Sequence, residues 1–113
     1  MRELVRILFK KPPSLEDFHI LIASGMVVPP AARLGMLSRT IDRDTVMQRL
    51  KVPVLVTTGE VDTVVMPAHT EHLLACIQHA EASLYEGIGH SPHLEAPEQF
   101  NRELTRFARQ YAG

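Results

Sequence analysis

The pattern of hydrophobic and polar residues divides the chain into two parts at about Lys51. Before this residue, apolar side chains recur every three or four positions between prolines and glycines, which predicts three or four short helices. After it, a continuous apolar run, an amphipathic stretch, a second short apolar run and a final amphipathic stretch follow one another. This order predicts strand, helix, strand and helix, so we expect an α/β protein.

Turn and capping residues place the helices of the first part. Ser14 lies three residues before Asp17, as in a capping box, and Gly25 is a suitable end for the apolar stretch that follows. Another helix is predicted to begin at Pro29-Pro30, and a last one to span residues 42–50. In that last helix we expect three apolar residues to point inward: Val46, Met47 and Leu50.

The second part contains the stronger signals. Residues 52–58 are apolar on both faces and rich in β-branched side chains, which is typical of a strand buried within a parallel sheet. Residues 82–86 form a second short strand, and a helix that begins at Pro67 lies between the two. A final helix begins at Pro97, and its apolar residues share one face: Phe100, Leu104, Phe107, Ala108 and Tyr111. Two parallel strands joined by a right-handed helical crossover are therefore expected.

Chemically active side chains follow both predicted strands. Asp62 lies in the loop after the first strand and His90 in the loop after the second. Because parallel strands end at the same edge of a sheet, we expect these two side chains to lie close together. A carboxylate beside an imidazole orients the ring and stabilises its protonated form, and the imidazole then acts as a general base. Taken alone, Asp62 could cap a turn and His90 could be a polar surface residue, but the pair favours a catalytic role.

Composition and charge narrow the class of protein. The chain has 113 residues, of which 45% are hydrophobic, which is typical of one globular domain. Its net charge of −1 favours neither nucleic acid nor an anionic membrane as a partner. No apolar run reaches the roughly 20 residues that span a bilayer, and the first residues are too charged for a secretion signal. Because Cys76 is the single cysteine, no intramolecular disulfide can form, and a cytoplasmic location is expected.

The two loop motifs together resemble the carboxyl-terminal part of an α/β-hydrolase. Residues 52–62 read Val-Pro-Val-Leu-Val-Thr-Thr-Gly-Glu-Val-Asp, and residues 87–101 read Gly-Ile-Gly-His-Ser-Pro-His-Leu-Glu-Ala-Pro-Glu-Gln-Phe-Asn. In that family, a strand followed by Gly-x-x-Asp supplies the acid of a catalytic triad, and a later Gly-His supplies the base. The resemblance, which covers residues 45–112, therefore implies that Asp62 is the acid and His90 the base.

The resemblance also implies a division of the chain and a class of reaction. Residues 51–113 correspond to the carboxyl-terminal part of the α/β-hydrolase core, and residues 1–50 are similar to the helical lid or cap that many members insert before it. The implied function is a serine-type hydrolysis of small esters or related acyl substrates, without a cofactor.

The nucleophile that the family requires is missing from this sequence. It lies on a Gly-x-Ser-x-Gly turn before the acid, and no such pentapeptide occurs here. We therefore expect a fragment, a truncated gene product or half of a split enzyme, which hydrolyses little alone and takes a small-molecule substrate once an amino-terminal half completes it. The alternative is a catalytically inactive remnant that docks to a partner or self-associates through an exposed strand edge.

Four further residues have the side chains of metal ligands. They recur every three or four positions along one predicted helix: His69, His72, Cys76 and His79. A single straight helix cannot surround a tetrahedral ion, so we interpret these residues as the solvent-facing flank of the helix and expect no metal.

Three polar residues close to the candidate pair receive other interpretations. Glu60 is near Asp62, but the family pattern places the acid at Asp62. His93 is interpreted as a loop residue near the mouth of the site. Glu95 is expected to serve the start of the last helix, where negative charge is favourable.

Overall fold

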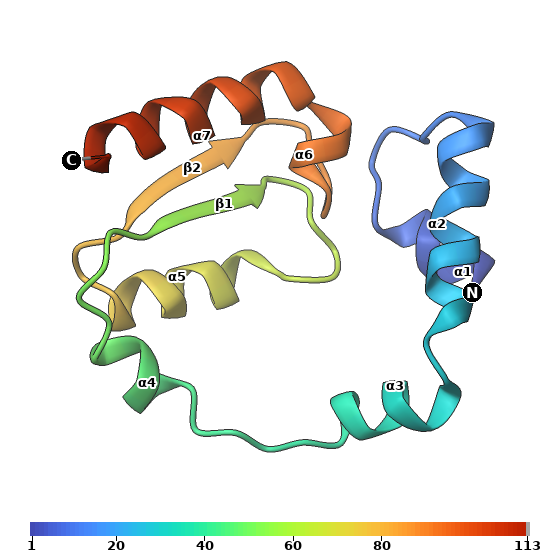
Figure 1. Cartoon of the computed structure of the whole chain (residues 1–113), viewed down its shortest axis with the longest axis horizontal. Helices are drawn as coiled ribbons and strands as arrows, with labels where there is room; N and C mark the ends of the chain where they lie inside the picture. The colour runs from blue at the N-terminus through green and yellow to red at the C-terminus, as the bar shows by residue number, and fades with distance from the viewer. Residues whose placement is uncertain (113) are drawn as a thin grey trace.

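A computed structural model of the chain describes residues 1–112, and their order of helices and strands confirms the α/β class (Figure 1). Four helices come first: α1 (Arg2–Ile7), α2 (Leu15–Val27), α3 (Pro30–Leu37) and α4 (Asp44–Gln48). The expected strand, helix, strand and helix follow, with one additional short helix before the last: β1 (Leu55–Gly59), α5 (Pro67–Cys76), β2 (Glu81–Tyr85), α6 (Pro92–Glu95) and α7 (Pro97–Tyr111).

The two strands form a parallel sheet. Their register runs from the Leu55–Glu81 pair to the Gly59–Tyr85 pair, and α5 makes the crossover between them. Figure 1 shows α5 and α7 on opposite sides of this sheet. Both strands end at the same edge, so the loop that follows β1 and the loop that follows β2 lie next to each other.

The buried core is small. Val56 of β1, Ile77 after α5 and Tyr85 of β2 are each less than a tenth exposed, and Val5 is buried in α1. The Tyr85 hydroxyl donates a hydrogen bond to Glu103 Oε2 on α7 at 2.6 Å. Burial, and then this carboxylate, raise the pKa of Tyr85 to about 12. The phenol therefore stays protonated and connects α7 to the sheet.

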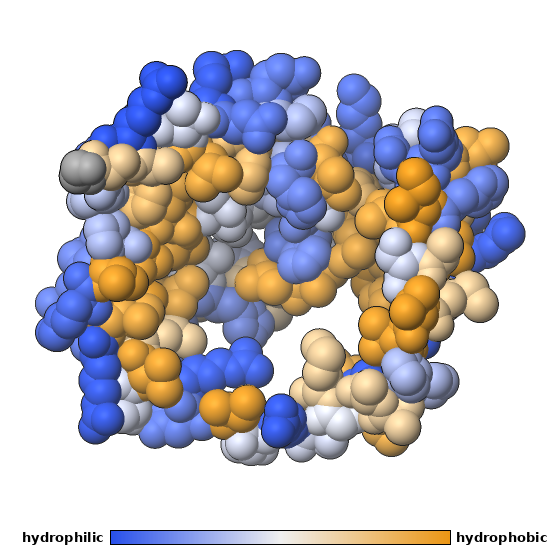
Figure 2. Space-filling model, viewed as in Figure 1, coloured by the Kyte–Doolittle hydropathy of each residue, from blue (hydrophilic) through white to orange (hydrophobic). Residues whose placement is uncertain are grey.

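The molecule exposes more surface than a compact domain of its size. Its accessible surface is 8415 Å², whereas about 6,200 Å² is expected for a compact monomer. Its radius of gyration is 15.8 Å, whereas about 13 Å is expected. Leu84 on β2 is 61% exposed, and Figure 2 shows apolar side chains on both sides of an opening between α3 and α5. Apolar surface is thus left uncovered by the described residues.

The start of α2 agrees with the sequence prediction. The Asp17 N–H donates a hydrogen bond to Ser14 Oγ at 3.1 Å, which confirms the capping interaction. Among residues 1–112, no single helix is long and apolar enough to cross a membrane. Only α2 and α3 taken together reach that length and composition, and they are bent by 85° at their junction.

Two predictions for the helical part are wrong. α2 continues through Gly25, and a Cβ at this position would lie 2.8 Å from Met1 Sδ, so the glycine makes room for a neighbouring side chain instead of ending the helix. α4 is shorter than the predicted 42–50 helix, and its Val46 is 61% exposed instead of inward. The spacing of apolar residues predicts which side of a short helix is apolar. It does not predict whether another element covers that side.

Candidate active site

The loops after β1 and β2 bring Asp62 and His90 into contact. His90 Nδ1 lies 2.9 Å from Asp62 Oδ2. Asp62 is buried, with 8% of its surface exposed, whereas 32% of the His90 side chain is exposed. The carboxylate therefore supports the imidazole from the interior, and the ring reaches the surface of the molecule.

Asp62 is held as a carboxylate by its hydrogen bonds. Its Oδ1 accepts the N–H groups of Val64 at 2.7 Å and Val65 at 2.9 Å. Burial acts to raise the pKa of Asp62, but the hydrogen bonds from Val65, His90 and Val64 outweigh it and hold the pKa below its usual value. An ionised carboxylate can only accept a hydrogen bond, so His90 Nδ1 is the donor in this contact. The second ring nitrogen, Nε2, is then the one that can face a reacting group.

The two loops approach so closely that one position requires glycine. A Cβ on Gly59 would lie 1.9 Å from the carbonyl oxygen of Gly89 and 2.4 Å from that of Ile88. The Val61 N–H donates to the same Ile88 oxygen at 3.1 Å, which joins the two loops directly. Gly87 has a φ of +67°, a left-handed conformation that favours glycine. The backbone thus fixes the distance between the segments that carry Asp62 and His90.

The neighbouring acid Glu60 does not contact the imidazole. Its Oε2 accepts the N–H of Gly87 at 2.8 Å, so it joins the two loops at the surface. The interpretation of His93 as a loop residue is wrong, because His93 lies on α6 and its ring packs near that of Phe100, with 5.9 Å between ring centroids. The sequence Ser91-Pro92 could have predicted the start of α6, because proline is favoured at the first position of a helix.

The interpretation of Glu95 as a partner for the start of α7 is also wrong. Its Oε2 accepts the backbone N–H groups of Lys10 at 2.8 Å and Lys11 at 2.9 Å. Its Oε1 accepts the N–H of Gly89 at 3.1 Å. Glu95 is the last residue of α6. Its carboxylate lies between the loop that precedes His90 and the segment between α1 and α2, because it binds backbone N–H groups of both. Glu95 therefore connects the first helices to the candidate site.

A cavity of about 160 Å³ lies beside Asp62 and His90. The first half of α5 forms one wall, where Thr70 Oγ1 donates a hydrogen bond to Thr58 Oγ1 of β1 at 3.2 Å. His69 also lines this cavity, although the sequence placed it only on a helix flank. Complete small-molecule pockets measure about 300–1,000 Å³, so this cavity has the size of a partial site.

Among comparisons with known proteins, only the comparison with solved structures finds similar proteins. No family model and no curated protein matches the sequence. A crystal structure from Burkholderia cenocepacia, assigned as an aryl esterase, matches 96% of this chain with a TM-score of 0.91 and 27% identity. An esterase from Rhodococcus sp. ECU1013 matches 99% with a TM-score of 0.87 and 26% identity. The 2-hydroxy-6-oxo-6-phenylhexa-2,4-dienoate hydrolase of Rhodococcus sp. strain RHA1 matches 96% with a TM-score of 0.71 and 25% identity. The chain spans only 40%, 41% and 43% of these three structures.

Proposed function

The chain has part of an α/β-hydrolase fold, and from this premise we propose that it supplies the acid and the base of a serine-type hydrolase. Asp62 is the acid, His90 is the base, and the substrates are small esters or related acyl compounds. The observation that carries the proposal is the 2.9 Å contact between His90 Nδ1 and Asp62 Oδ2 at the ends of two parallel strands. The likeness to two esterases supports the substrate class.

Each side chain has a defined role in this reaction. Asp62 keeps the proton on His90 Nδ1, so that Nε2 accepts the proton of a nucleophilic hydroxyl as its oxygen attacks the ester carbonyl. The charge of Asp62 then stabilises the imidazolium. His90 returns this proton to the departing alcohol, and it next takes a proton from the water that cleaves the acyl-enzyme.

We propose that the nucleophile comes from a segment outside these 113 residues, since no serine of the chain lies in a Gly-x-Ser-x-Gly turn. The chain spans about two fifths of the compared structures, which supports a longer complete enzyme. Its accessible surface of 8415 Å² exceeds that of a compact monomer by about 2,200 Å², which is more than the roughly 800 Å² that each partner buries in a standard protein interface. In this proposal residues 51–113 belong to the core, and residues 1–50 form a lid that Glu95 ties to it.

The uncovered surface also supports a second candidate function, docking without catalysis. Each strand of the described sheet has one neighbour, so β1 has an unpaired edge within residues 1–112. An unpaired edge on a sheet that also exposes an apolar residue, Leu84 of β2, is a suitable site for pairing with a second chain. Size-exclusion chromatography with light scattering tests this candidate, and a monodisperse monomer would contradict it.

Hydrolysis of p-nitrophenyl acetate by the complete enzyme, in which this chain is joined to the segment that carries the nucleophile, tests the proposed reaction. We expect His90→Ala and Asp62→Asn each to lower kcat by about 10³-fold or more. The first variant lacks the base, and the second lacks the carboxylate that keeps the imidazole in the correct tautomer and stabilises the imidazolium. Glu60→Gln is the matched control, because it keeps an acceptor for Gly87 and should leave kcat near the wild-type value. Unchanged hydrolysis in His90→Ala overturns the proposal.

A further inference from the structure

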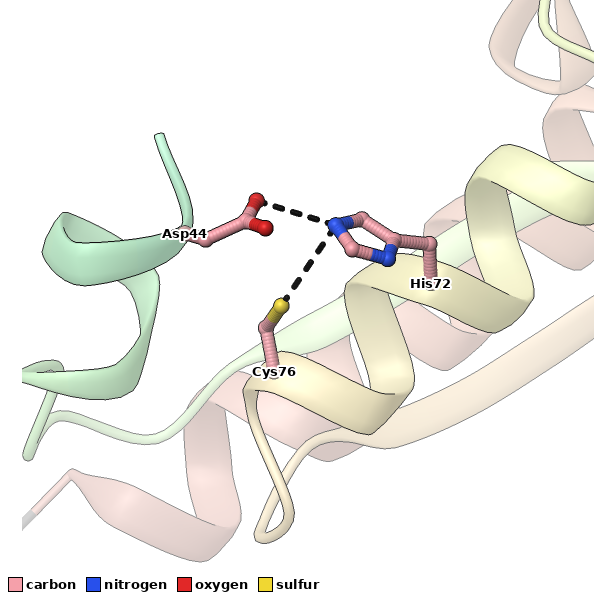
Figure 3. Close-up of side chains that lie close together, drawn as sticks. All are labelled: Asp44, His72 and Cys76. Atoms are coloured by element: carbon pink, nitrogen blue, oxygen red, sulfur yellow. Dashed lines mark hydrogen bonds and ion pairs between the residues drawn. The ribbon is translucent and has the colours of Figure 1, made fainter. Parts of the chain in front are cut away.

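A second cluster of polar side chains lies at the end of α5 remote from the candidate active site. Figure 3 shows Asp44 of α4 pointing toward His72 and Cys76 of α5. His72 Nε2 lies 2.9 Å from Asp44 Oδ1 and 3.7 Å from Cys76 Sγ. All three potential ligand atoms lie within 4.8 Å of one another.

The sequence alone gave no reason to group these three residues. His72 and Cys76 are four positions apart on one helix, so they project from the same face. Asp44 comes from a separate element that precedes β1, and it supplies the direction of approach that one straight helix lacks. Of the predicted flank, His69 lies at the active-site cavity and His79 faces the carbonyl oxygen of Val52 at 2.9 Å, so neither belongs to this cluster.

The spacing of the three atoms fits a zinc ion. Zinc binds nitrogen and oxygen at about 2.0–2.1 Å and sulfur at about 2.3 Å. Tetrahedral angles then place neighbouring nitrogen and oxygen ligands about 3.3 Å apart, and nitrogen and sulfur ligands about 3.6 Å apart. The two contacts of His72 Nε2, 2.9 Å and 3.7 Å, therefore differ from a coordinated geometry by only a few tenths of an ångström.

We propose that Asp44, His72 and Cys76 bind one zinc ion, with water in the fourth position. The mixed oxygen, nitrogen and sulfur ligand set suits zinc better than the hard cations calcium or magnesium. Zinc can enter without unfolding, because 51% of the Asp44 side chain and 61% of the His72 side chain are exposed. A cavity of about 450 Å³ between α4 and α5 also reaches Cys76.

The bound ion links α4 to α5. Without it, the helices are joined here by the exposed hydrogen bond between Asp44 and His72. The cluster contains neither Asp62 nor His90, so the ion takes no part in the proton transfers of the proposed hydrolysis. The site is a structural one that holds the segment leading into β1 against the crossover helix.

Titration of the 113-residue chain with zinc chloride, followed by calorimetry, tests the proposal. We expect one ion per chain and a higher melting temperature with zinc than with magnesium. Cobalt replaces zinc in such sites, so the cobalt-loaded chain should show a near-ultraviolet thiolate-to-cobalt absorption band. Cys76→Ser should remove this band, and His72→Ala and Asp44→Ala should each weaken zinc binding by about tenfold or more.

His19→Ala is the matched control, because it removes an exposed imidazole on α2, far from the cluster in sequence, and it should bind zinc like the wild type. Circular dichroism of each variant checks that the fold is kept. The wild-type measurements need no variant at all: absence of stoichiometric zinc binding, or a cobalt complex without the thiolate band, overturns the proposal. Equal zinc affinity in the wild type and in His72→Ala also overturns it.

Discussion

Replacing Gly59 with alanine tests whether the packing of two loops aligns Asp62 with His90. The new methyl group would lie 1.9 Å from the carbonyl oxygen of Gly89, and ordinary contact begins at 3.4 Å, so the backbone at Gly89 has to move by about 1.5 Å. This backbone leads directly into His90. We therefore expect the 2.9 Å contact between His90 Nδ1 and Asp62 Oδ2 to be lost or lengthened.

The size of the effect follows from the contacts that change. Overpacking costs about 1–3 kcal/mol. Loss of the hydrogen bond between the Val61 N–H and the Ile88 oxygen adds about 0.5–1.5 kcal/mol. We expect Gly59→Ala to lower the free energy of unfolding by about 2–4 kcal/mol. In the complete enzyme, displacement of the imidazole by about 1 Å should lower kcat about 100-fold.

Two measurements on the 113-residue chain check this expectation. Urea unfolding followed by circular dichroism gives the free energy, and long-range proton–nitrogen NMR reports whether His90 still carries its proton on Nδ1. Gly35→Ala is the matched control, because a Cβ at Gly35 of α3 has open space within 4 Å and should stabilise the helix by up to about 1 kcal/mol. If both variants are equally stable and Gly59→Ala keeps the tautomer, the argument from loop packing is wrong.

Two further predictions concern the carboxylates around the site. Glu95→Ala removes the oxygen that accepts the N–H groups of Lys10 and Lys11, so these two amides should exchange with deuterium about 10- to 100-fold faster. Glu98→Ala on α7 is the control and should leave their exchange unchanged, so equal protection in the two variants would contradict the role of Glu95. The pKa of Asp62 lies below its usual 3.8 in the folded chain, so its stabilising effect is complete above that value and is lost as the pH falls through the lower folded pKa. Acid titration should therefore destabilise the wild type more steeply than Asp62→Asn, and parallel curves would count against this account.

The contact between Asp62 and His90 could be predicted because it depends on local patterns and one topological rule. The apolar run before Gly59, the proline at the start of α5 and the second short strand each have a clear sequence signal. The handedness and direction of a strand–helix–strand unit then leave little choice about where the two following loops lie. Their proximity needs no knowledge of the remaining chain.

The contacts of Glu95 and Asp44 could not be predicted in this way. Glu95 binds the backbone of residues 10 and 11, and Asp44 binds His72, so both contacts depend on how irregular segments dock onto α5 and α6. Backbone N–H groups have no sequence signature, and one acidic residue on a five-residue helix carries no periodic signal. The exposure of Val46 has the same origin, since burial depends on what covers a helix and not on its own pattern.

The carboxylate of Glu95 also bears on the order in which the chain folds. Within the described residues, hydrogen bonds between residues 1–37 and the strand region all end on Glu95, and the bond to Lys10 joins positions 85 residues apart. Closing a loop of this length costs about 4 kcal/mol in chain entropy, and two hydrogen bonds to a charged group return about 3–6 kcal/mol. The first three helices should therefore attach after the strands have paired, and on unfolding they should be the first part of the chain to detach.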